Sequence, residues 1–195
     1  MSLSLKKGQK ISLSKENAGL SELVVGLGWD EVKQKSGLFS SKPKNIDCDA
    51  FALLLTNGRL AAKSDIVYYA NKHHYSESVI HTGDNLTGAG EGDDEQIIVK
   101  LNELPAQYDR VVIGVNIYSA AARKQHFGMI QNAFIRIVDA KTNNEMCIYN
   151  LTENYSGQTA MAFGEVYRHN GEWKFTALGQ GSNDDSIEEF ADRYR

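Results

Sequence analysis

Residues 164–177 read G-E-V-Y-R-H-N-G-E-W-K-F-T-A, with β-branched and aromatic residues on both sides of Asn170-Gly171. An Asn-Gly pair readily adopts the positive φ angles that a type I′ turn requires, and this turn matches the twist of two antiparallel strands. The stretch therefore predicts a β-hairpin near the end of the chain.

Further strands are expected along most of the chain. Apolar or alternating runs predict them at 23–29, 46–55, 65–70, 96–101, 111–118, 134–139 and 147–150. Asn57-Gly58 adds a second hairpin signal directly after the strand at 46–55. Eight or so short strands separated by turn signals favour an all-β fold, a two-sheet antiparallel β-sandwich.

Two helical segments accompany these strands. Residues 119–132 could hold a short turn or helix on a crossover. Ser186 and Glu189 form a capping-box pattern at the start of an amphipathic stretch, which predicts a C-terminal helix at about 185–195. With 195 residues the chain is expected to form a single domain, residues 1–195.

Hydropathy, cysteine spacing and net charge argue against several classes of function. The N-terminus has lysines but no apolar run behind them, and no stretch approaches the roughly 20 apolar residues of a membrane span. We therefore expect no signal peptide, no membrane insertion and a cytoplasmic location. Cys48 and Cys147 have no metal-ligand spacing and are expected to be reduced thiols. A net charge of −4 without a basic-aromatic stripe argues against nucleic-acid binding.

The strongest functional signal is an acidic, glycine-rich stretch. Residues 83–95 read G-D-N-L-T-G-A-G-E-G-D-D-E and contain five carboxylates, four glycines and no lysine or arginine. Outside this stretch, 20 acidic residues face 21 basic ones, so the whole acidic excess lies in it. Carboxylates and backbone carbonyls without His or Cys suit a hard cation, and Ca²⁺ fits better than Mg²⁺. The alternative is a solvated acidic loop; an EF-hand is excluded by the spacing.

Other acids could join this stretch. Asp47 and Asp49 lie two apart at the start of an expected strand, so their side chains share one face. Asp30 ends the preceding strand, and Asp65 begins another. If these strand ends converge on 83–95, a site for two calcium ions becomes stereochemically reasonable.

Several motifs together resemble the TerD family of tellurium-resistance and general stress proteins. They are S-L-K-K-G-Q-K-I-S-L-S-K at 4–15, V-G-L-G-W-D at 25–30, D-C-D-A at 47–50, H-T-G-D-N-L-T-G-A-G-E-G-D-D-E at 81–95, N-A-F-I-R-I-V at 132–138, A-M-A-F-G-E-V-Y-R-H-N-G-E-W-K-F at 160–175 and G-Q-G at 179–181. The resemblance covers nearly the whole chain up to about residue 181. It implies a cytoplasmic, calcium-binding β-sandwich without established catalysis. It also implies partners among other tellurium-resistance proteins or a membrane-associated protein of the TerC type.

The resemblance also implies a ligand set. The family's metal-binding positions fall on Asp84, Asn85, Glu91, Asp93, Asp94 and Glu95, with Asp47, Asp49 and Asp65 in support and Asp30 as an additional candidate. Asn45 and Phe51 depart from the family pattern, which often has aspartate and serine there. We expect a non-catalytic protein in which Ca²⁺ orders the acidic stretch to form an interaction surface. The alternative is a metal-dependent phosphohydrolase that uses the same carboxylates.

Overall fold

The computed structural model describes residues 2–31, 46–83 and 92–195, and it confirms an all-β fold in two sheets. Sheet A contains, in spatial order, β1 (Leu3–Leu5), β10 (Asn144–Asn150), β9 (Ile130–Asp139), β3 (Glu22–Glu31), β7 (Glu95–Lys100) and β6 (Val79–His81). Sheet B contains β2 (Lys10–Ser12), β12 (Glu172–Ser182), β11 (Ala160–His169), β8 (Arg110–Ile117), β4 (Cys48–Leu55) and β5 (Ile66–Val67). Pairing is antiparallel throughout the described strands, except that β1 runs parallel to β10.

The two sheets bury the main core between their inner faces. Leu27 and Ile97 of sheet A and Ile113 and Phe163 of sheet B belong to one apolar cluster, each no more than 1 % exposed. In β8, alternate residues from Val111 onward face this cluster, as the sequence predicts.

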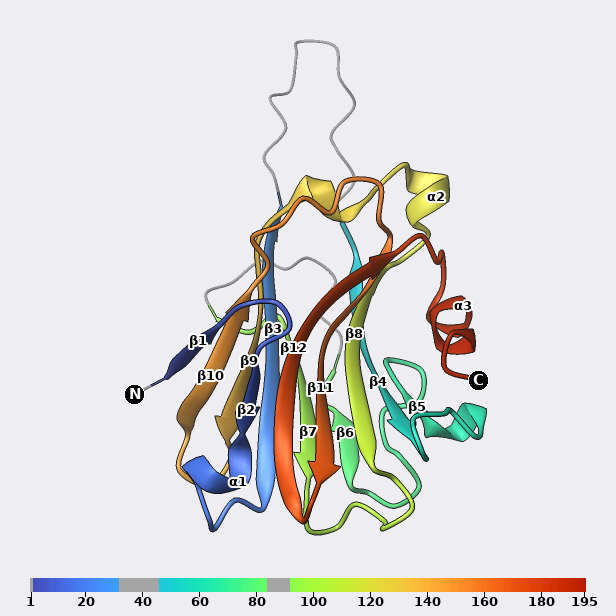
Figure 1. Ribbon diagram of the computed structural model, residues 1–195. Helices are drawn as coiled ribbons and strands as arrows, with labels where there is room; N and C mark the ends of the chain where they lie inside the picture. The colour runs from blue at the N-terminus through green and yellow to red at the C-terminus, as the bar shows by residue number, and fades with distance from the viewer. Residues whose placement is uncertain (1, 32–45, 84–91) are drawn as a thin grey trace.

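A second apolar cluster covers the outer face of sheet B, where α3 (Ile187–Asp192) packs. Phe190 of α3 meets Phe51 of β4 edge to face, with ring centroids 5.0 Å apart. Figure 1 shows α3 beside the β4 and β5 side of the molecule and α2 (Ala120–Arg123) at the upper end. The remaining short helices are α1 (Leu13–Glu16), η1 (Lys63–Asp65) and η2 (Phe127–Met129).

Both Asn-Gly turns are confirmed. Asn170 and Gly171 have φ angles of 53° and 76°, and they join β11 to β12 with His169 opposite Glu172. Asn57 and Gly58 have φ angles of 52° and 75° after β4. Positive φ at both central positions is the signature of the type I′ turn.

Several elements have other bounds than predicted. The strand expected at 65–70 is reduced to Ile66–Val67, because Asn71 Nδ2 donates to the Ile66 carbonyl at 2.7 Å and closes a tight turn. The crossover at 119–132 contains short helices as predicted, α2 and η2, but β9 begins at Ile130, before the expected start at 134. The C-terminal helix spans Ile187–Asp192 only, although Ser186 caps it as predicted by accepting from the Glu189 N–H.

Candidate functional site

Two glycines of β3 make room for the end of the acidic stretch. A Cβ on Gly26 would overlap the Asp93 carboxylate, and a Cβ on Gly28 would meet the Gly92 carbonyl oxygen at 2.8 Å. The Asp94 N–H donates to the Leu27 carbonyl at 2.7 Å. The G-L-G pattern of β3 therefore lets residues 92–94 lie directly against the strand, on the side of the sheet away from the core.

Asp93 is neutralised by the protein itself. Arg136 of β9 donates from Nε to Oδ1 at 2.7 Å and from Nη2 to Oδ2 at 3.0 Å, and Gln96 Nε2 adds a bond at 2.9 Å. The hydrogen bonds that Arg136 donates to Asp93 raise the pKa of the Arg136 guanidinium. Gly26 is the sheet partner of both Gln96 and Arg136, so the missing Cβ lies at the centre of this contact. The Asp93 side chain is only 2 % exposed, and a two-pronged Arg–carboxylate contact of this kind is strong and directional.

Asp94 and Asp30 stand together at the end of β3. Asp94 Oδ2 accepts from the Trp29 N–H at 2.7 Å, and Asp30 Oδ2 accepts from Asn132 Nδ2 at 2.8 Å. Burial raises the pKa of the Asp94 carboxyl, and the negative charges of Asp30 and Asp93 raise it further. This end of the strand therefore concentrates negative charge beside the acidic stretch.

The Glu95 side chain points into the interior between the two sheets. Its Oε2 accepts from the Ala50 N–H of β4 at 2.7 Å and lies 3.4 Å from His81 Nε2. The Gly83 N–H donates to His81 Nδ1 at 3.2 Å, so this ring nitrogen is the acceptor. Glu95 thus links sheet A to sheet B across the interior.

Asp49 lies on β4 of sheet B, and Asp47 directly precedes this strand. Asp49 is opposite Asn116 in the sheet register and is 5 % exposed, and its strand neighbour on the same face, Phe51, packs under α3. Asp47 Oδ2 lies 3.5 Å from Arg123 Nη1, while its buried Oδ1 has no hydrogen-bond partner among the described residues. The face that Asp49 shares with Phe51 is the outer face of sheet B, and the predicted sharing of this face by Asp47 stays a prediction.

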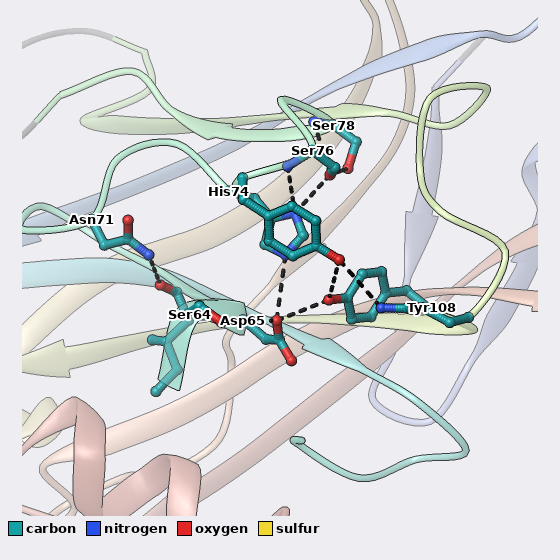
Figure 2. Close-up of polar contacts among 10 residues, drawn as sticks. Ser64, Asp65, Asn71, His74, Ser76, Ser78 and Tyr108 are labelled. Atoms are coloured by element: carbon teal, nitrogen blue, oxygen red, sulfur yellow. Dashed lines mark hydrogen bonds and ion pairs between the residues drawn. The ribbon is translucent and has the colours of Figure 1, made fainter. Parts of the chain in front are cut away.

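Asp65 belongs to a separate buried network (Figure 2). Its Oδ1 accepts from the Tyr108 hydroxyl at 2.9 Å and lies 3.5 Å from His74 Nε2. His74 Nδ1 lies 2.6 Å from Ser76 Oγ, which in turn contacts Ser78 Oγ at 2.7 Å. Ile66, the next residue after Asp65, pairs with Leu53 of β4, four positions from Asp49, so about 13 Å separates these two regions.

Asp65, His74 and Ser76 are the residue types of a nucleophilic catalytic triad and contact one another in that order. The surroundings of His74, however, favour a structural role. His74 has no solvent exposure, and its ring packs against those of Tyr75 and Tyr108 at centroid distances of 4.2 and 5.2 Å. A substrate cannot reach the imidazole through these contacts. The network connects η1 with the segments that precede β6 and β8, and apart from Asp65 the sequence carried no signal for it.

The described members of the predicted ligand set thus go to five places: Asp93 to the outer face of sheet A, Asp94 with Asp30 to the end of β3, Glu95 to the interior, Asp47 and Asp49 to sheet B, and Asp65 to its own network. Asp84, Asn85 and Glu91 lie outside the described residues. Within residues 2–31, 46–83 and 92–195, no three His, Cys, Asp or Glu side chains gather as a metal-binding group. In the same ranges, no helix has the length and apolar character needed to cross a bilayer.

The fold and the described end of the acidic stretch define a class of protein: a two-sheet β-sandwich in which residues 92–94 lie against β3. The TerD domain model matches residues 1–194, and the chain belongs to the TerD family.

Named relatives place the family in stress and tellurium resistance. The stress response protein SCP2 of Bacillus subtilis is 50 % identical over 198 residues and covers the whole of both chains. The tellurium resistance protein TerD of Serratia marcescens is 47 % identical over 182 residues, which are 93 % of this chain and 91 % of the relative. A crystal structure of SAV2460, a protein of unknown function, superposes with a TM-score of 0.67 at 25 % identity, over 89 % of this chain and 95 % of the other.

Proposed function

We propose that this chain is a non-catalytic calcium-binding stress protein of the tellurium-resistance type, in which Ca²⁺ orders residues 83–95 and creates an interaction surface. The observation that carries the proposal is the position of Asp94: its carboxylate accepts from the Trp29 N–H and feels the negative charge of Asp30, at the point where residues 92–94 lie against β3. Oxygen donors with concentrated negative charge and no His or Cys are the donor set that a hard divalent cation prefers.

The geometry narrows the ligand set. Asp93 already has the Arg136 guanidinium as its counter-charge, and Glu95 is engaged inside the sandwich by Ala50 and His81. Both are therefore assigned to anchoring the stretch. The ligands we propose are Asp94, Asp30 and the acidic-stretch residues Asp84, Asn85 and Glu91. Their four carboxylates would balance the charge of two Ca²⁺ ions.

The anchors explain how ion binding could change a surface. Residues 92–95 are held at both faces of sheet A, by Arg136 outside and by Ala50 inside. An ion bound next to Asp94 would therefore act on a stretch whose end is already fixed, and less conformational entropy remains to be lost. The surface so formed would serve cytoplasmic partners, among them other tellurium-resistance proteins or a membrane-associated protein of the TerC type.

The test separates ligands from anchors. Chelator-stripped protein is titrated with Ca²⁺ and Mg²⁺ by calorimetry, and its thermal unfolding is followed in EDTA and in each ion. A hundredfold excess of Ca²⁺ over the dissociation constant should stabilise the fold by about 2.7 kcal/mol. Asp94→Asn should weaken Ca²⁺ binding by about tenfold or more, because one ligand charge is lost.

Two further variants complete the design. Asp93→Asn should lower the stability of the ion-free protein and weaken Ca²⁺ binding less than Asp94→Asn does, because Asp93 fixes the stretch without being a proposed ligand. Glu16→Gln, on the exposed face of α1, is the matched control and should change neither quantity. No saturable Ca²⁺ binding by the wild-type chain would refute the proposal. Phosphoester hydrolysis that disappears in Asp94→Asn would instead support the phosphohydrolase alternative.

A further inference from the structure

A cavity of about 250 Å³ opens on the outer face of sheet B, between the end of β8 and the start of α3. Its walls include three aromatic side chains, Tyr68, Tyr69 and Tyr118, and three carboxylates, Asp49, Asp185 and Glu188. None of the residues lining this cavity is Lys, Arg or His. It lies on the other sheet from Asp93 and Asp94, so it is distinct from the proposed calcium site.

The tyrosines present ring surface to solvent. Tyr69 and Tyr118 are 38 % and 45 % exposed, which is unusual for large side chains in this structure. Tyr68 supports Tyr69 edge to face, with centroids 5.1 Å apart and an interplanar angle of 79°. Tyr118 is held from outside the cavity by Arg123, whose guanidinium carbon lies 5.0 Å from the ring centroid. Two exposed rings are therefore fixed by neighbours before any ligand arrives.

Carboxylates give the floor and the rim of the cavity a negative charge. Asp49 is buried on β4 beside Asn116, its partner in the register, whereas Glu188 stands exposed in the first turn of α3. Burial raises the pKa of the Tyr69 hydroxyl, and the charges of Asp49 and Glu188 raise it further, so both carboxylates act at this ring. Asp185 accepts from the Ala121 N–H at 2.9 Å and joins α3 to α2 at the rim.

We propose that this cavity binds a small organic ammonium compound, with the cation against the rings of Tyr69 and Tyr118 and near the Asp49 carboxylate. Aromatic faces attract cations through their quadrupole, and rings combined with carboxylates recognise alkylammonium groups. A metal ion is less suited, because the three carboxylates do not gather as a metal-binding group, as is true throughout the described residues, and ring faces supply no ligand oxygens. The volume accommodates a molecule of the size of choline or a short diamine rather than a bare inorganic ion.

The experiment titrates the full chain with choline, tetramethylammonium and putrescine, followed by NMR and calorimetry, once in EDTA and once in saturating Ca²⁺. At least one compound should bind saturably in both conditions, because the cavity does not share residues with the proposed calcium ligands. The neutral isostere 3,3-dimethylbutan-1-ol should bind at least about tenfold more weakly than choline, since it has the shape without the charge.

The affinities of three variants test whether the compounds bind in this cavity. Tyr69→Leu should weaken binding about tenfold, and Glu188→Gln, a change at an exposed position, should weaken it a few-fold without affecting folding. Tyr75→Leu alters another exposed tyrosine, remote from the cavity, and should leave the affinity unchanged. Absence of saturable binding for all three cations up to roughly 10 mM, equal binding of the neutral isostere, or unchanged affinity in both cavity variants would each overturn the proposal.

Discussion

Replacing Gly26 by alanine tests whether the acidic stretch is anchored on β3 as the structure indicates. The new Cβ would overlap all three carboxylate atoms of Asp93, so the carboxylate has to leave its contact with Arg136 and Gln96. Overpacking typically costs 1–3 kcal/mol, and separating a buried ion pair about 3–5 kcal/mol. The Arg136 side chain is 33 % exposed, so water recovers part of this loss. We expect a net destabilisation of about 3 kcal/mol.

The assay is urea and thermal unfolding in EDTA, so that no ion contributes. For a chain of this length, 3 kcal/mol corresponds to a fall in melting temperature of roughly 6–12 °C. The matched control is Gly19→Ala, where the nearest atom to the new Cβ is Asn17 Oδ1 at 3.6 Å, an ordinary contact. This control should change the free energy of unfolding by less than about 0.5 kcal/mol.

A double-mutant cycle identifies the cause. In an Asp93→Ala background the carboxylate is already absent, so Gly26→Ala should cost much less, with a coupling energy of at least about 1 kcal/mol. Equal costs of Gly26→Ala in both backgrounds would refute the reasoning, because the loss would then come from the strand itself. A cost below about 0.5 kcal/mol in the wild-type background would do the same.

Three further predictions concern other parts of the fold. Burial lowers the pKa of the His74 imidazole below 6.5, although Asp65 acts in the opposite direction. The unfolded chain therefore binds a proton at this residue at a higher pH than the folded chain does. Stability should therefore be unaffected by this residue above pH 6.5 and fall below it by at most about 1.4 kcal/mol per pH unit; His74→Gln should flatten this slope, and an unchanged slope contradicts the assignment. Cys48 and Cys147 are 1 % and 0 % exposed, and burial raises the pKa of the Cys147 thiol to about 12, so a disulfide reagent should label both only after unfolding; rapid labelling of the native chain would disprove this. Gly171→Ala, at a φ of 76°, should cost about 1 kcal/mol in chemical unfolding, and a neutral effect would mean that the turn tolerates a Cβ.

The elements predicted correctly have local causes. The type I′ turn at Asn170-Gly171 follows from two residues that accept positive φ, and the cap of α3 follows from the Ser186 hydroxyl and the next turn of backbone. The apolar face of β8 is likewise predicted by the apolar residues at alternate positions of the strand. Such features depend on residues that are close together in the sequence, so they can be predicted from the sequence alone.

The elements missed have distant causes. β1 and β2 contain three residues each, and they become strands because β10 and β12 offer free edges to them. The strand expected at 65–70 stops after Val67, because the Asn71 side chain closes a turn. Strands this short gain little from their own propensity, so their existence depends on the partner strand that the fold provides.

The acidic stretch shows the same division. From the sequence alone one could read its charge, its lack of basic residues, its suitability for a hard cation and its resemblance to the TerD family. Only the tertiary structure sent Asp93, Asp94 and Glu95 in three directions, because the chain bends at Asp94 before β7 begins and each side chain meets a different partner: Arg136, the Trp29 N–H and the Ala50 N–H. The counter-charge of Asp93 is Arg136, 43 residues away in the chain and brought alongside by the pairing of β3 with β9. Sequence composition states how much charge a segment carries, whereas the partner of each charge depends on which distant strands the fold places next to it.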